Sequence, residues 1–201
     1  MVEFGYEKMR CIYPLLIQQF IDDYNLYNGI AVDIGSGPAN LSVELCKVTN
    51  MEVFLVDNSQ EQLSKAREAC ESIKVDNKLS YINACVENIP IKDNFADFIM
   101  CRGSIGFWKS PEIGLNEIYR ILKPNAIAIV GVGVGRYMPK TMSDRIYNDM
   151  IKRYELNGNI NRPTRYTSAQ MEEIMNKTDI ENYKIIEEDT PLLGCWVEFT
   201  K

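Results

Sequence analysis

A glycine-rich segment, residues 33–40, carries the clearest chemistry in the sequence, which reads Asp-Ile-Gly-Ser-Gly-Pro-Ala-Asn. Glycine has no Cβ, so Gly35 and Gly37 let the backbone turn tightly and approach a ligand closely. Open parallel sheets bind ligands beyond the carboxyl ends of their strands, where this segment is expected. A tight turn without a ligand is the alternative. A valine at Gly37 is expected to clash in the turn and to abolish ligand binding.

A carboxylate, Asp57, ends the next predicted strand, twenty residues after Gly37. At that place it can accept hydrogen bonds from both ribose hydroxyls of an adenosine-containing ligand. The alternative is a loop aspartate that caps or solvates the following helix. The glycine turn ahead of it favours the ribose role.

The sequence of the turn distinguishes two kinds of adenosine-containing ligand. A dinucleotide fingerprint reads G-x-G-x-x-G, and here Asn40 occupies the last position. Asp33, two residues before Gly35, would repel a pyrophosphate but would suit an amino group and a sulfonium. The segment therefore favours a sulfonium nucleoside over a dinucleotide.

Alternating strands and helices are predicted around these residues, which indicates βαβ units and a largely parallel sheet covered on both faces. The last two strands have no helix between them and are expected to pair antiparallel through a turn at 191–194. Pro38 is expected to begin a helix, Ser59 with Gln62 to cap the next, and Thr167 with Gln170 a later one. The predicted strands are 29–35, 53–56, 79–82, 98–101, 127–132, 183–187 and 195–200, and other predicted helices are 7–24, 110–122 and 143–154.

The length of 201 residues suits one domain. The predicted fold class is a three-layer, Rossmann-like α/β domain whose seven-stranded, mainly parallel sheet has an antiparallel C-terminal strand. Residues 1–28 are expected to form a helical lid, and residues 135–166 an insertion on the substrate side. The helix after Ser59 is expected to bury a stripe of Leu63, Ala66, Cys70 and Ile73.

Four segments, in this order, resemble class I S-adenosylmethionine-dependent methyltransferases of the small-molecule kind. Residues 33–39 resemble the family's first motif, and 87–97 resemble its "E-N-L-P-F" segment before the fourth strand. Residues 102–108 resemble the loop after that strand, and 117–124 the "E-x-x-R-v-L-k-P" helix and turn. The similarity covers nearly the whole chain.

The resemblance implies that the chain binds S-adenosyl-L-methionine and leaves S-adenosyl-L-homocysteine as product. It implies that Asp57 holds the ribose, that Asn58 lies beside the adenine, and that Cys85 and Val86 flank the adenine's other side. The residues implied at the methionine end are Asp33 near the amino group, Gly35, Ser36 and Gly37 alongside, and Arg102, Gly103 and Ser104 closing over it.

The sequence departs from the family pattern in three places, one of them a pair of residues. Ala39 replaces a third glycine and is expected to be tolerated if its backbone stays helical. Cys85 stands where many members have an aspartate that accepts from the adenine amino group. Asn125 and Ala126 replace a glycine pair, and asparagine tolerates a left-handed turn conformation.

Composition excludes several classes of function. The net charge of −6 argues against general nucleic-acid binding, and the absence of histidine removes the commonest general base and metal ligand, so no metal is expected. The six cysteines form no C-x-x-C pair and are expected to be reduced structural thiols. No apolar run could span a bilayer, and charged residues among the first ten argue against a signal peptide, so a cytoplasmic location and no membrane partner are expected.

Methyl transfer to a small-molecule acceptor is the activity that the resemblance implies, with no base, acceptor or oligomeric state identified. Two alternatives stay open: a non-catalytic S-adenosylmethionine-binding or sensing protein, and a nicotinamide-dependent oxidoreductase. An anionic or aromatic acceptor would match the arginines and tyrosines of the insertion, although a solvated helix face with scattered charges is the favoured explanation: Arg136, Tyr137, Arg145, Arg153, Arg162, Arg165 and Tyr166. Tyr6, Tyr13 and Trp108 are expected either to line the pocket or to pack the N-terminal segment on the sheet.

Overall fold

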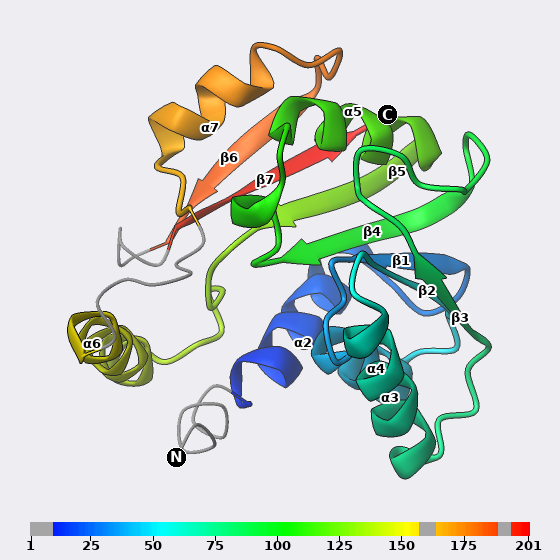
Figure 1. Ribbon diagram of the computed structural model, residues 1–201, viewed down its shortest axis with the longest axis horizontal. Helices are drawn as coiled ribbons and strands as arrows, with labels where there is room; N and C mark the ends of the chain where they lie inside the picture. The colour runs from blue at the N-terminus through cyan, green and yellow to red at the C-terminus, as the bar shows by residue number, and fades with distance from the viewer. Residues whose placement is uncertain (1–9, 157–163, 189–193) are drawn as a thin grey trace.

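The computed structural model describes residues 10–156, 164–188 and 194–201, which form a three-layer α/β domain (Figure 1). The central sheet has seven strands in the order β3-β2-β1-β4-β5-β7-β6. The strands are β1 Ile30–Ile34, β2 Glu52–Asp57, β3 Leu79–Asn83, β4 Ala96–Arg102, β5 Leu122–Gly131, β6 Tyr183–Glu187 and β7 Cys195–Thr200. The predicted fold class is confirmed.

The strand directions define the edge of the sheet at which a ligand is expected to bind. Strands β1 to β5 pair in parallel, and β7 pairs antiparallel with both β5 and β6. It follows that β6 runs in the direction of β5. The strand order reverses between β1 and β4, and such a switch point opens a crevice at the carboxyl ends of the strands.

Helices cover both faces of the sheet (Figure 1). Helices α2 Ile12–Tyr24, α3 Asn40–Val48 and α4 Gln60–Ile73 pack on one face, together with α6 Lys140–Leu156. Helices α5 Pro111–Ile121 and α7 Ser168–Met175 pack on the other. A short 3₁₀ helix, η1 Ile105–Phe107, follows β4.

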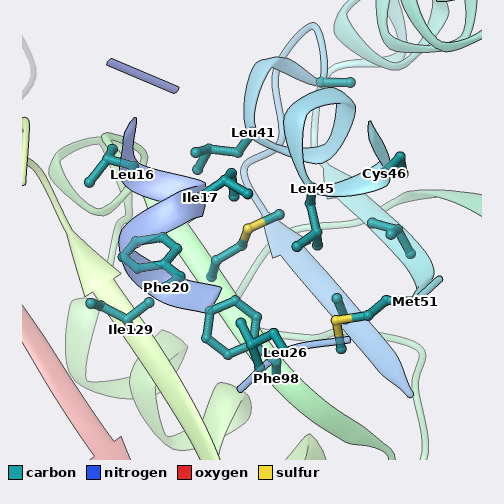
Figure 2. Close-up of a cluster of buried hydrophobic side chains, with 14 of the residues drawn as sticks. Leu16, Ile17, Phe20, Leu26, Leu41, Leu45, Cys46, Met51, Phe98 and Ile129 are labelled. Atoms are coloured by element: carbon teal, nitrogen blue, oxygen red, sulfur yellow. The ribbon is translucent and has the colours of Figure 1, made fainter. Parts of the chain in front are cut away.

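The N-terminal helix α2 is part of the hydrophobic core. Figure 2 shows Leu16, Ile17 and Phe20 of α2 gathered with side chains of α3, β4 and β5. The Phe20 ring lies 5.9 Å from the Phe98 ring and 6.1 Å from the Trp196 ring, measured between centroids. Because it fills this space, α2 is an integral layer of the domain over the residues that the structure describes.

Local sequence signals set most element ends, but the structure differs from the prediction at the starts of α3 and β5 and in the apolar stripe of α4. The Thr167–Gln170 capping box is present, and Ser59 accepts a hydrogen bond from the Gln62 amide. Helix α3, however, begins at Asn40 and not at Pro38, because Ala39 adopts a left-handed φ of 66°. Strand β5 begins earlier than predicted, with a register shift against β4. On α4, Ile73 is 38% exposed, so the predicted apolar stripe ends at Cys70.

Within the described ranges, no helix has both the length and the apolar character needed to cross a membrane. All six cysteines are free thiols, and four of them are buried. Cys85 is the exposed one, which departs from the expectation of structural thiols throughout. The turn predicted between β6 and β7 falls largely outside the described residues.

Candidate cofactor site

The loop after β1 takes the conformation that its glycines permit. Gly35 has φ 65° and Gly37 has φ 53°, both in the left-handed region. The amides of Gly35 and Ser36 donate to the carbonyl of Val56, at 2.8 and 3.1 Å. The loop is therefore folded back against the end of β2, the strand that carries Asp57.

The two glycines differ in their surroundings. A Cβ on Gly35 would overlap the side chain of Ser104, in the loop after β4. A Cβ on Gly37 would meet only the Gln62 Oε1 atom, at 4.0 Å. The conflict that a Cβ at Gly37 would meet within the protein is therefore with the left-handed φ of the turn and not with a neighbouring loop. A direct overlap with a neighbouring loop occurs at Gly35, because the loop after β4 packs there.

The carboxylate of Asp57 organises the same loop. Its Oδ2 accepts the Gly37 amide at 2.9 Å, and its Oδ1 accepts the Ser59 amide at 2.9 Å. The alternative role of Asp57, holding the start of the next helix, is thus present. A carboxylate oxygen can accept more than one hydrogen bond, so both oxygens can still accept from ribose hydroxyls.

A hydroxyl group ties the loop after β4 to the loop after β1. The Ser104 hydroxyl donates to the carbonyl of Ile34 at 3.2 Å and accepts the Trp108 indole N–H at 3.2 Å. It also lies 2.9 Å from the Cys101 sulfur. The Gly103 amide donates to the carbonyl of Gly131 at 2.7 Å, which adds the end of β5.

A cavity of about 630 Å³ opens where these loops meet. Small-molecule sites span about 300–1,000 Å³, so the cavity can hold a nucleoside cofactor. All but two of the predicted cofactor residues line it: Gly35, Gly37, Asp57, Asn58, Cys85, Val86, Arg102, Gly103 and Ser104. Further lining residues that sequence reasoning missed include Gln62, Glu87, Phe107 and Lys109. Their types carry no ligand signal, and only the place of Glu87 and Phe107 within the family-like segments, and of the others near a motif, could have suggested them.

Asp33 and Ser36 do not line this cavity. The Asp33 side chain is buried and accepts hydrogen bonds from the hydroxyl and the backbone of Ser42, the former at 2.6 Å. It thus caps α3, whose own N-cap residue, Ala39, provides no side-chain hydrogen bond. Burial raises the pKa of Asp33 to about 7. The Ser36 hydroxyl is buried, and no described residue offers it a hydrogen bond.

The wall formed by the loop after β3 is anchored to α5. The Glu87 carboxylate accepts the backbone amides of Lys109 at 3.0 Å and Ser110 at 3.4 Å. The Trp108 ring lies against Gly114 of α5, where a Cβ would stand 2.9 Å from the ring. Trp108 therefore lines the cavity, which is one of the two roles expected of it, and it packs against α5 and not between the N-terminal segment and the sheet.

Two of the family-like segments hold the scaffold. The Glu117 carboxylate accepts the Ile89 amide at 2.8 Å and pairs with Arg120, which also bonds Asp93 at 2.6 Å. Among the polar atoms of this network, none lines the cavity. The resemblance of residues 87–97 and 117–124 to the family thus reports chiefly on how the loop after β3 is held.

The predicted substrate side is joined to α2. Arg136 forms an ion pair with Asp23, and the Tyr137 hydroxyl donates to Asp22 at 2.7 Å. These two residues are therefore engaged inside the chain. Among the others, Arg145 is exposed, and Nη2 of Arg165 lies 3.0 Å from the Met150 sulfur. The residues that the structure describes do not include Tyr6, Arg162 or the side chain of Arg153.

Arg102 stands between the cavity and α2. Its Nε donates to the carbonyl of Gly133 at 3.0 Å, and its guanidinium lies 5.3 Å from the centre of the Tyr13 ring. Desolvation lowers the pKa of the Arg102 side chain, and the nearby Glu188 carboxylate opposes that shift. A guanidinium so placed is suited to a carboxylate at this end of the cavity.

Known proteins resemble the chain in sequence and in fold. A chloroplastic 2-methyl-6-phytyl-1,4-hydroquinone methyltransferase from Oryza sativa subsp. japonica is 32% identical over 120 residues, or 59% of this chain and 34% of that protein. The chain therefore spans only about a third of that relative's length. The structure of a putative S-adenosyl-L-methionine-dependent methyltransferase from Methanococcus maripaludis has a TM-score of 0.86 and 29% identity, covering 99% of this chain and 89% of the other.

A third protein, the phosphoethanolamine N-methyltransferase 2 of Haemonchus contortus in complex with S-adenosyl-L-methionine, shares the fold alone. Its TM-score is 0.62 at 21% identity, covering 88% of this chain and 39% of that one. The model of the methyltransferase domain family matches residues 32–140, from the middle of β1 to the start of α6. This stretch contains the glycine turn, Asp57 and the loop after β4. The chain therefore belongs to the methyltransferase domain family, within class I of the S-adenosylmethionine-dependent methyltransferases.

Proposed function

We propose that this protein transfers a methyl group from S-adenosyl-L-methionine to a small-molecule acceptor. The observation that carries the proposal is the cavity where the Gly35–Gly37 turn, the Asp57 carboxylate and the loop after β4 meet. It lies at the switch point of the sheet, where open α/β sheets bind ligands. Family membership and the similarity to the Methanococcus maripaludis structure support it.

The bound cofactor would supply a methyl group already activated by its positive sulfur. The chain's part would be to align acceptor and methyl at about 3–3.5 Å and to exclude water. In this proposal Asp57 and Asn58 hold the ribose and adenine, with Cys85 and Val86 on the adenine's other side. Arg102, Gly103 and Ser104 close over the methionine end.

Asp33 and the glycine turn would complete the methionine end. The Gly35 and Gly37 backbone would run alongside it, and the buried Ser36 hydroxyl would find its missing partner in the cofactor. Asp33, although turned toward Ser42, would place its charge behind the turn and so favour a cationic ligand.

The whole chain would form a single domain. The acceptor would enter it between α2 and residues 135–166. The contact of Arg136 with Asp23 supports this placement because it joins the two elements, and the contact of Arg102 with Tyr13 places α2 beside a residue that lines the cavity. The net charge of −6 favours a small molecule over nucleic acid, and six free thiols favour a reducing compartment such as the cytoplasm.

Calorimetric titration with S-adenosyl-L-homocysteine and with NAD tests the cofactor. We expect only the first to bind, and Asp57→Ala to weaken it by about 1–3 kcal/mol, the usual size for lost charged hydrogen bonds. Asp76→Ala, at an exposed site in another surface hollow, is the matched control and should bind as the wild type does. Equal binding by the two variants would remove Asp57 from the site.

A second assay separates an enzyme from a binding protein. Transfer of labelled methyl from S-adenosyl-L-methionine into a metabolite pool should require the wild-type protein. Tight binding of the nucleoside without any transfer would favour the non-catalytic sensing alternative.

A further inference from the structure

Residues 131–135, which comprise the last residue of β5 and the loop after it, are glycine-rich and closely packed, and the proposed function does not use them. A Cβ on Gly131 would overlap the backbone of Cys195 in β7, and one on Gly133 would overlap Glu188. A Cβ on Gly135, at φ 77°, would stand 2.6 Å from the Gln19 side chain of α2. The alternating glycines therefore let this loop fit between three neighbours.

One carboxylate oxygen holds the loop. Oε1 of Glu188 accepts the amides of Val134 and Gly135, each at 3.0 Å, and the indole N–H of Trp196 at 2.7 Å. Glu188 directly follows β6, which runs in the direction of β5, so the residue stands at the carboxyl edge of the sheet. Three N–H donors on one ionised oxygen make a strong anchor.

The anchored loop in turn holds Arg102. Gly133 lies against Glu188 on one side, and its carbonyl accepts Nε of Arg102 at 3.0 Å. The charged and polar groups around the guanidinium are the Glu188 carboxylate, the guanidinium of Arg165 and Tyr13. Among these, Glu188 is the anion, so it offsets two cations at the edge of the cavity.

From these contacts we infer that Glu188 is a positioning residue: it fixes the loop after β5 and, through Gly133, sets the Arg102 guanidinium at the methionine end of the cofactor site. The inference rests on the proposed function. It requires Glu188 to affect only ligands that reach Arg102. The adenosine half of the cavity, built from the loops after β2 and β3, has no contact with Glu188 among the described hydrogen bonds.

The test compares two ligands, S-adenosyl-L-homocysteine and adenosine, because only the first has a methionine end. Glu188→Ala should weaken S-adenosyl-L-homocysteine by about tenfold or more, the size of a lost charged hydrogen-bond anchor, and leave adenosine binding unchanged. Glu188→Gln keeps an oxygen acceptor for the N–H groups but removes the charge, so its loss should be smaller. Glu187→Ala, at the exposed neighbour, is the matched control.

A double-mutant cycle adds a readout that a merely structural role would not move. In an Arg102→Ala background, Glu188→Ala should cost little further affinity. Independent, additive losses, or equal losses for the two ligands, would overturn the inference. If Glu188→Ala does not fold, the Glu188→Gln measurement decides by the same ligand comparison. Failure of the wild type to bind S-adenosyl-L-homocysteine would instead contradict the proposed function.

Discussion

The two edges of the central sheet use similar polar residues in opposite ways. At the amino edge, the Asp97 carboxylate accepts the Ile30 amide at 2.9 Å and pairs with Lys123 at 2.8 Å. At the carboxyl edge, Asp57 also accepts backbone amides, but its side chain lines an open cavity. The Ser36 hydroxyl beside it is buried and has no described partner. The polar groups at the amino edge therefore find their partners within the chain, whereas Asp57 and Ser36 at the carboxyl edge can still form hydrogen bonds with a ligand.

The family-like segments contain residues of both kinds. Glu117, Arg120 and Lys123 belong to a segment that resembles the family as well as the glycine turn does, yet their partners lie within the scaffold. The resemblance to the family therefore covers residues that hold the fold as well as residues that face the cavity. Their hydrogen-bond partners distinguish the two.

The largest expected effect follows from crowding Gly35 at the carboxyl edge. Gly35→Val should abolish binding of S-adenosyl-L-homocysteine, because the side chain collides with Ser104 and moves two loops apart. Overpacking and left-handed strain together should also cost about 2–5 kcal/mol of stability. Thermal unfolding and calorimetric titration measure the two effects.

Gly37→Ala is the companion variant, because its Cβ would come no closer than 4.0 Å to a neighbouring atom, the Gln62 Oε1. It should fold with a loss of only about 1–2 kcal/mol from left-handed strain. Equal stability of the Gly35 and Gly37 variants would contradict the packing that joins the loops after β1 and β4.

Asp33 is the exception at the carboxyl edge, since its charge is buried against Ser42. Its pKa is about 7 in the folded chain and 3.8 ordinarily, so between these values the folded protein binds more protons than the unfolded one. The Asp33 contribution to stability therefore falls as pH rises from about 4 to 7, by about 1.4 kcal/mol per unit of pKa difference, and is constant above that.

Asp33→Asn cannot ionise and should lack this fall. The stability of the variant relative to the wild type should increase between pH 5 and 8, measured by chemical denaturation at each pH. A difference that is independent of pH would show that Asp33 is ionised throughout.

Glu117 holds the loop after β3, so Glu117→Ala should lower the stability of the fold without changing the affinity of the cofactor site. It leaves the Ile89 amide and Arg120 without their carboxylate, which should cost about 1–2 kcal/mol of unfolding free energy. Affinity for S-adenosyl-L-homocysteine should stay within about twofold, with Glu173→Ala as an exposed control for stability. A large loss of affinity would place the Glu117 network in the cofactor site.

The smallest effect is expected at Ala39, where two contributions oppose each other. Glycine would relieve left-handed strain of about 1–2 kcal/mol, but it would remove a buried methyl worth about 0.8 kcal/mol and add chain entropy to the unfolded state. The stability of Ala39→Gly should therefore stay close to that of the wild type in denaturant unfolding. A clear stabilisation would mean that strain dominates this turn.

Much of the site was predictable because its signals are local. The left-handed turn needs residues such as Gly35 and Gly37, and Asn125 at φ 64° confirms the same reasoning at the turn inside β5. The expected tolerance of Ala39 depended on a helical backbone, and that condition is not met, because the third position of the turn is also left-handed. Cys85, which is predicted to flank the adenine, lines the cavity, whereas Phe107 and Lys109, whose types carry no ligand signal, were missed.

By itself, the sequence determined the alternation of strands and helices, the antiparallel final strand, the glycine turn and the capping box at Thr167. Each of these depends on residues within one turn or one strand, where propensity and backbone sterics act directly. Only the tertiary structure decided which polar groups are already satisfied. Asp33 accepts a hydrogen bond from Ser42, nine positions along the chain, and Ser104 packs against Gly35. Glu188 accepts backbone amides of a loop more than fifty residues away. Such pairings depend on which strands become neighbours, because a carboxylate turns toward the nearest donors that folding brings to it.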